Sequence, residues 1–228
     1  MALKSVKPSN RTEGKIQRTI RRYHQAKTNA MDSVDALARF LRLAATARLY
    51  ANRQPATVSA HSLGAHFLQY SLEIVGSMES LSAAQNVVLL APCTRAAGHK
   101  EWLSKVHPKG QVFVTFNAED AVLFGAFVAD GSQMKLGVEP GSDLLDSRAV
   151  RYVSFTRAAM TFGGHRYFVA ESGQKLQKRA LKLFGRMFRS LPDFELSEHP
   201  NDVYLSCDAD RLTCYMAAPA DPSAGGPS

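Results

Sequence analysis

The sequence has few cysteines and no long apolar run, and each shortage narrows the class of protein. Cys93, Cys207 and Cys214 cannot all pair and lack the spacing of zinc ligands, a pattern typical of a reducing compartment. The longest apolar runs are too short to cross a bilayer, and no apolar segment follows the basic start as in a signal peptide. We therefore expect a cytoplasmic protein with no membrane span, no metal and no organic cofactor.

Acidic residues are almost missing from the first 27 positions. Residues 1–27 hold eight Lys or Arg against the single acid Glu13, so the other 201 residues carry only +1 of the net charge of +8. The composition predicts a solvated, disordered leader. Contact with acidic surfaces or nucleic acid, and a transit peptide, remain open as lesser alternatives. No specific nucleic-acid partner is expected, because aromatic residues are not interleaved with the basic ones and no recognition helix is evident.

Periodicity predicts one domain over residues 28–218, followed by a disordered tail at 219–228. Helical spacing favours a helix near 34–49, capped by Asp32 or Ser33, and another near 172–191. The first helix would bury one face, made of Val34, Leu37, Leu41, Ala44, Ala45 and Leu49. Strand-like runs occupy 56–60, 86–92, 111–117 and 150–155, and residues 202–217 resemble a hairpin that turns at "DAD". Strands alternating with helices predict an α/β three-layer sandwich with a mostly parallel sheet.

The stretch "ATVSAHSLGAHFLQY", residues 56–70, passes from a strand through Ser62 directly into a helix. Small residues two before and two after the serine, Ala60 and Gly64, suit the sharp turn of a nucleophile elbow. The N-terminus of the following helix would favour negative charge at the hydroxyl, and the N–H of Leu63 would donate to an oxyanion. A plain helix cap at Ser62 explains the same pattern and remains the alternative.

A serine nucleophile needs an imidazole base and a carboxylate that orients it. Glu119 and Asp120 follow the strand at 111–117, and we prefer Asp120 for its shorter side chain. His165 follows the strand at 150–155 behind two glycines, in the order Ser, acid, His. His61 is a possible pocket residue, and His66 is expected to pack on the helix after Ser62. Three further acids, in a loop that is a candidate lid (130–149), are expected to be solvated: Asp130, Asp143 and Asp146.

Together, "AHSLGAHFLQ", "VVLLAP", "VFVTFNAEDAVL" and "GGHRYF" resemble the α/β-hydrolase fold family, most closely an uncharacterised bacterial esterase/lipase-like branch. The resemblance spans roughly residues 24–170. It implies hydrolysis of a small-molecule carboxylic ester through an acyl-serine, with Ser62 as nucleophile, Asp120 as orienting acid, His165 as general base and the Leu63 N–H as one oxyanion donor.

The chain departs from that family before the elbow. Family members have several strands there, and a loop after one of them supplies a second oxyanion donor; residues 1–55 contain no convincing strand and no "HGGG"-like loop. The chain thus resembles an N-terminally shortened hydrolase, and its alternative function is that of an impaired or non-catalytic remnant that acts as a binding protein. The uncovered edge of the elbow strand would favour a homo-oligomer.

Overall fold

The structure is a computed structural model that describes residues 10–53, 56–74, 79–147, 149–156, 158, 164–169, 178–189, 205–207 and 213–216. Its centre is a six-stranded sheet in the order β1-β2-β3-β4-β6-β5. The strands are β1 (Val58–His61), β2 (Val87–Leu90), β3 (Val112–Phe116), β4 (Val150–Ser154), β5 (Leu205–Cys207) and β6 (Thr213–Met216). The first five strands in this order pair in parallel, and β5 pairs antiparallel with β6.

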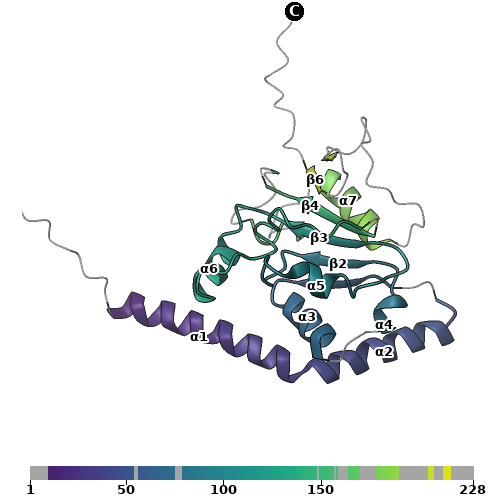
Figure 1. Cartoon of the computed structure of the whole chain (residues 1–228), viewed down its shortest axis with the longest axis horizontal. Helices are drawn as coiled ribbons and strands as arrows, with labels where there is room; N and C mark the ends of the chain where they lie inside the picture. Colours follow the sequence, from purple (N-terminus) through teal and green to yellow (C-terminus); the bar gives the residue numbers. More distant parts are fainter. Residues whose placement is uncertain are drawn as a thin grey trace, which may run out of the picture.

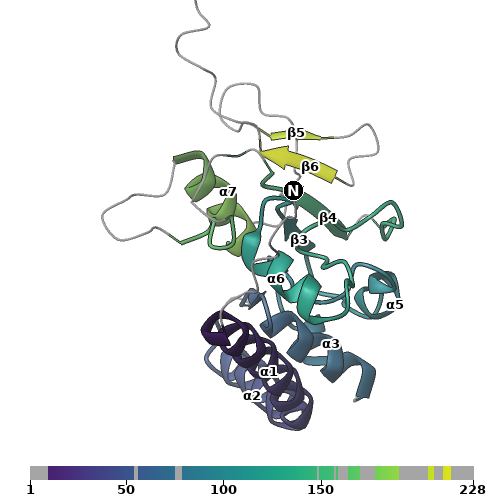
Figure 2. The same cartoon turned by 90° about the vertical axis from the view of Figure 1, so that its left-hand side faces the viewer.

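Helices cover both faces of the sheet, as strands of continuous apolar residues require. They are α1 (Asn10–Asp32), α2 (Val34–Tyr50), α3 (Gly64–Ile74), α4 (Glu79–Ser82), α5 (His99–Leu103), α6 (Ala121–Ala129) and α7 (Lys178–Phe188). Figure 2 shows α7 and α5 on opposite sides of the sheet. The fold is therefore α/β with a mostly parallel sheet.

Alternate residues of β2, β3 and β4 enter two separate cores, because successive side chains of a strand point to opposite faces. Val88 and Leu90 of β2 face a core that contains the inner side of α7, including Leu183 and Met187. Val87 and Leu89 face the other core, which contains residues of α2, α3 and α5. All four residues of β2 are buried, so this strand has no polar face.

The helix α6 follows β3 directly, so it marks the carboxyl end of the parallel strands. Figure 1 shows α6 beyond this end, with α1 passing below it and α2 continuing along the sheet. α1 packs on both α3 and α6. Since chemistry in parallel sheets lies beyond the carboxyl ends of the strands, α1 lies beside the expected site.

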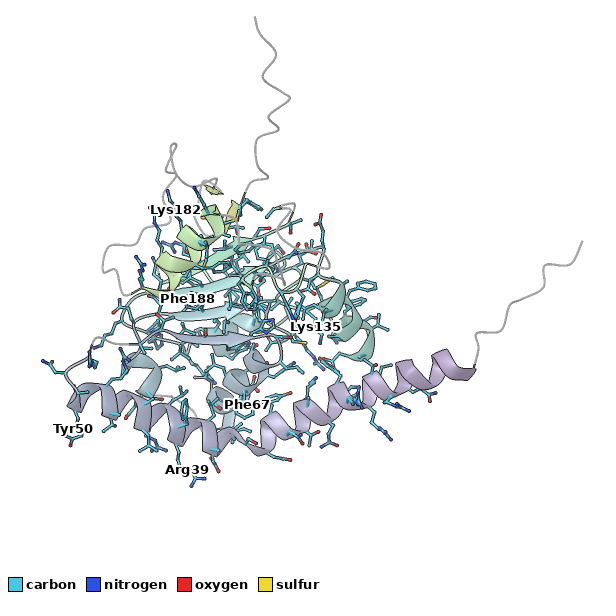
Figure 3. All side chains as sticks on the ribbon, turned by 180° about the vertical axis from the view of Figure 1, so that it is seen from behind. Arg39, Tyr50, Phe67, Lys135, Lys182 and Phe188 are labelled. Atoms are coloured by element: carbon cyan, nitrogen blue, oxygen red, sulfur yellow. The ribbon has the colours of Figure 1, made fainter. Side chains whose placement is uncertain are left out.

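A buried ionic cluster fixes α1 to the loop after α6. Asp130 accepts hydrogen bonds from Lys135, from Lys27 (2.9 Å) and from the Tyr23 hydroxyl (3.1 Å). The side chain of Lys135 is fully buried and that of Asp130 is 6% exposed. Figure 3 shows Lys135 inside the molecule on the side where α6 lies. Burial alone would raise the pKa of Asp130, but the hydrogen bonds and charges of Lys135 and Lys27 outweigh it and hold that pKa well below its ordinary value.

The structure corrects several expectations about the N-terminal part of the chain. The leader is helical from Asn10, because Tyr23 and Lys27 find partners on the domain that composition alone does not reveal. Asp130 is not a solvated acid, because it is the counter-charge of those partners. Leu49 is 80% exposed rather than inward, while Ala38 is buried. Ser33 precedes α2 but makes no capping hydrogen bond with its side chain.

The cysteines of the C-terminal part also differ from what the sequence led us to expect. Cys214 is disulfide-bonded and is the register partner of Cys207 across β5 and β6, whereas Cys93 is a free buried thiol. Disulfides persist in oxidising compartments, so the cysteine argument for a reducing compartment does not hold. The turn expected at "DAD" and the tail at 219–228 lie outside the described residues. None of the described helices has both the length and the apolar character needed to cross a membrane.

The ionic cluster predicts that Asp130→Asn will strongly destabilise the protein. The substitution keeps the side-chain shape but leaves the buried Lys135 ammonium without its counter-charge, and loss of one partner of a buried pair costs about 3–5 kcal/mol. Urea unfolding would measure the loss in the free energy of unfolding. Asp143→Asn is the matched control, because the Asp143 side chain in its pair with Lys100 is 78% exposed and such pairs contribute at most about 1 kcal/mol.

The same cluster predicts the direction in which the free energy of unfolding changes with pH. Because the pKa of Asp130 is lowered by folding, its contribution is complete above the unfolded carboxyl pKa of about 4 and is lost as the pH falls through the lower folded value. Below about pH 4 the wild type should therefore lose stability and approach Asp130→Asn. Equal unfolding free energies of Asp130→Asn and wild type at pH 7 would contradict a stabilising role for the cluster.

Candidate active site

Ser62 follows β1 directly and has a strained backbone. Its φ of +53° lies in the left-handed region, which residues other than glycine rarely adopt. Three hydrogen bonds hold the turn: the Ser62 N–H donates to Leu90 O (2.9 Å), and the Ser62 carbonyl accepts from the N–H groups of Ala65 and Cys93 (3.1 Å each). Such strain persists only where the surroundings impose it, and it concentrates at functional sites. The geometry is that of a sharp strand-turn-helix elbow.

The residues around Ser62 match an elbow better than a helix cap. Within the described residues the Ser62 hydroxyl makes no capping hydrogen bond to α3, and the N–H of Leu63 has no acceptor. A Cβ added to Gly64 would lie 3.9 Å from the Ala60 Cβ, an ordinary contact, so the turn accepts alanine at position 64 but little more. The free N–H of Leu63 at the start of α3 is available to a negatively charged oxygen.

Asp120 and His165 are in direct contact beyond the carboxyl ends of β3 and β4. His165 Nδ1 lies 2.7 Å from Asp120 Oδ2, and both residues are buried. The other oxygen of Asp120, Oδ1, accepts from the N–H of Leu123 (2.8 Å) and so caps α6. Glu119 is exposed to solvent, so the structure brings Asp120 and not Glu119 to the imidazole.

Gly164 and Asn117 join the loop of the base to the loop of the acid. Asn117 Nδ2 donates to Gly164 O (2.9 Å), and Asn117 Oδ1 accepts from the N–H of Glu119 (3.1 Å). Gly164 has φ +67°, and a Cβ there would lie 2.5 Å from Asn117 Nδ2. Sequence reasoning did not assign a role to Asn117; its position directly after a buried strand and three residues before the acid was the available signal.

Tyr167 anchors the segment that carries His165. Its ring is fully buried and stacks on Phe155 at 4.4 Å between centroids, and its hydroxyl is hydrogen-bonded to Thr115 and to the N–H of Ala91. Burial raises the pKa of Tyr167 well above its ordinary value, so the hydroxyl stays protonated. The imidazole two residues earlier is thereby tied to β3 and to the end of β2.

His61 packs against His165. It is not in the wall of the cavity beside Ser62, and its role as a pocket residue stays a prediction. Its ring centroid lies 4.8 Å from that of His165 and 4.7 Å from that of Phe168. Burial, and then the nearby His165, lower the pKa of His61 to about 4, so its ring is neutral at pH 7. His66 is buried on α3 and stacks on Tyr70, with its pKa lowered to about 4 by burial and by the charges of Lys27 and Lys135.

A cavity of about 590 Å³ opens beside Ser62 between α1 and α6. Ser62 and Leu63 lie in its wall together with residues of α1 and α6. Among the described residues no direct hydrogen bond joins the Ser62 hydroxyl to His165. Catalytic hydrogen bonds are often long before substrate binds, so the missing contact does not by itself exclude a catalytic arrangement of these side chains.

Comparison of the chain with protein-family models, with curated proteins and with solved structures gave no match. Within the part of the chain that the structure describes, no group of three or more His, Cys, Asp or Glu side chains has the arrangement of a metal site.

The contact between Gly164 and Asn117 predicts that Gly164→Ala will destabilise the protein more than the backbone strain alone explains. The left-handed conformation costs roughly 1–2 kcal/mol for alanine, and the added Cβ must also displace Asn117 or the loop. Gly98→Ala is the matched control, because Gly98 has φ +76° but open space around its Cβ position. Chemical denaturation should show the larger loss for Gly164→Ala, and equal losses would contradict the clash.

Proposed function

We propose that the protein is a serine hydrolase that cleaves carboxylic esters through an acyl-serine intermediate. The observation that carries the proposal is the contact between Asp120 and His165, formed at the same edge of the sheet where Ser62 occupies a strained turn. The residue types that this chemistry requires follow the ends of β1, β3 and β4, and two of them, Asp120 and His165, are in direct contact. The α/β-hydrolase resemblance of the sequence supports the same assignment.

In the acylation step, Ser62 Oγ attacks the ester carbonyl carbon while His165 Nε2 removes the hydroxyl proton. The Leu63 N–H donates to the oxyanion that forms, and the bond to the alcohol breaks as His165 returns the proton to the leaving oxygen. Asp120 stays ionised throughout, because its function is to hold Nδ1–H of His165 and to stabilise the imidazolium. His61, with its lowered pKa, remains neutral and does not compete as a base.

In the deacylation step, water takes the place of the alcohol. His165 removes a proton from the water, the hydroxide attacks the acyl carbon, and the proton passes to Ser62 Oγ as the acid leaves. We assign only the Leu63 N–H as an oxyanion donor within the described residues. Since one missing donor typically lowers turnover about 10²- to 10³-fold, turnover is expected to be slow.

A non-catalytic binding protein on the same scaffold is the second candidate. The lack of a direct hydrogen bond between Ser62 and His165 favours it, as does the single assigned oxyanion donor. In that case the cavity beside Ser62 would bind a ligand without cleaving it. Ester hydrolysis that depends on both Ser62 and His165 distinguishes the two candidates.

A homo-oligomer through the sheet edge stays a prediction. β1 lies at one edge of the described sheet, and its Ser59 is exposed. The Thr57 hydroxyl just before β1 donates to Phe188 O of α7 (3.2 Å), so part of this edge is covered by the chain itself.

A fluorophosphonate probe tests the serine hydrolase directly, because it reacts only with an activated serine and loses fluoride as Oγ binds phosphorus. We expect wild-type labelling that is absent in Ser62→Ala. Asp120→Asn should lower the hydrolysis of p-nitrophenyl esters by about 10⁴-fold, since the amide disfavours the productive tautomer of His165. Asparagine remains a good helix cap, so this variant should keep α6 folded.

Glu119→Gln is the matched control for Asp120→Asn, because the neighbouring carboxylate is exposed, and its activity should equal that of wild type. Labelling of Ser62→Ala equal to that of wild type, or no labelling of folded wild type, would reject the proposal. Equal activities of Asp120→Asn and Glu119→Gln would remove Asp120 from the mechanism.

A further inference from the structure

The wall of the cavity beside Ser62 is apolar except for a few hydroxyl and thiol groups. None of its described lining residues is Lys, Arg, Asp, Glu or His. Away from the Leu63 N–H, a charged group placed there would lose hydration without gaining an oppositely charged partner, so the wall along α6 disfavours charged ligands. Its volume of about 590 Å³ falls within the range of about 300–1,000 Å³ that is typical of small-molecule sites.

The helix α6 explains why the cavity is apolar. Its sequence, "AVLFGAFVA", contains no polar residue, although a surface helix normally has a polar face. Val122 and Val128 are 57% and 55% exposed, and both lie in the cavity wall. Part of the exposed apolar surface of α6 is therefore gathered at the cavity rather than scattered over the protein, as expected of a binding site.

Small residues of α6 leave the space open. Gly125, Ala126 and Ala129 all line the cavity, and a Cβ added to Gly125 would meet no atom within 4 Å. The opposite wall comes from α1, through Thr19, Ile20 and Tyr23. Tyr23 is held in place by Asp130 and Lys135, so the ionic cluster fixes this wall.

We infer that this cavity binds the acyl chain of the substrate, and that the substrate class is esters of apolar acyl chains longer than acetyl. The inference rests on the proposed function, because Ser62 and Leu63 in the wall define where the ester carbonyl lies. An acyl group bonded to Ser62 Oγ extends from that point along α6, where it contacts only uncharged side chains. Each added methylene that enters the cavity should raise kcat/KM by roughly fourfold, the equivalent of about 0.8 kcal/mol for a buried methylene.

A chain-length series on the full-length protein tests the inference. For p-nitrophenyl acetate, butyrate and octanoate we expect kcat/KM to rise at least about a hundredfold from the first to the last. Gly125→Leu should fill the cavity and lower kcat/KM far more for octanoate than for acetate, which removes most of this rise. Gly185→Leu is the matched control, since Gly185 is also a helical glycine with open space around its Cβ position but lies in α7, outside the cavity wall.

Two further measurements test the acyl site without relying on Gly125→Leu. Val128→Ser removes apolar surface at a residue that is already more than half exposed, so it should fold normally and lower octanoate hydrolysis selectively. Calorimetry with Ser62→Ala needs no turnover, and it should detect binding of methyl octanoate but not of methyl acetate.

The outcomes separate the two proposals. If the probe labels Ser62 but kcat/KM does not change with chain length, or Gly125→Leu slows acetate and octanoate equally, the acyl site is overturned and the serine hydrolase stands. If no labelling occurs while methyl octanoate binds Ser62→Ala, the hydrolase fails and the chain-binding cavity stands. If methyl octanoate does not bind, or if Gly125→Leu changes only the oligomeric state, the acyl site is overturned.

Discussion

The carboxylate of Asp120 is the contact on which the arrangement of the site depends. One oxygen caps α6 and the other binds His165, so the same side chain fixes a wall of the cavity and the orientation of the His165 imidazole. Asp120 can make both contacts at once, because a capping side chain at the start of α6 lies at the carboxyl end of β3, next to the loop after β4. While Asp120 caps a folded α6, His165 can bind its other oxygen in few conformations. The contact that orients the imidazole therefore also contributes to the stability of the domain.

Ser62 is held differently, by backbone strain instead of a side-chain contact. Its positive φ is stabilised by Leu90 and Cys93, which flank the end of β2, so the elbow depends on the neighbouring strand and not on β1 alone. This explains how a four-residue strand at the sheet edge can support so sharp a turn. Ser62 and the segment that carries His165 are therefore both attached to the end of β2, since the Tyr167 hydroxyl accepts from the N–H of Ala91, one residue after Leu90.

The sequence predicts those parts of the fold in which local pattern and burial agree. Continuous apolar runs such as "VVLL" are strands because both faces of a parallel sheet are covered, and Asp120 and His165 follow from their places after such strands. Asn117 and Tyr167 were not predicted, because their roles arise from partners about 50 residues away along the chain. Local pattern also failed for α1, whose residues look solvated until Asp130 supplies a partner more than 100 residues later.

The packing of α1 on α6 encloses the cavity. Without α1, the apolar surface of α6 beside Ser62 would be an open groove, whereas Ile20 and Tyr23 make it a pocket with two walls. Helix α1 therefore contributes in two ways. Its Lys27 pairs with a buried carboxylate, and its uncharged residues line the cavity. A buried ion pair contributes little net stability compared with apolar packing, but it fixes one orientation strongly, because any other leaves a charge unpaired.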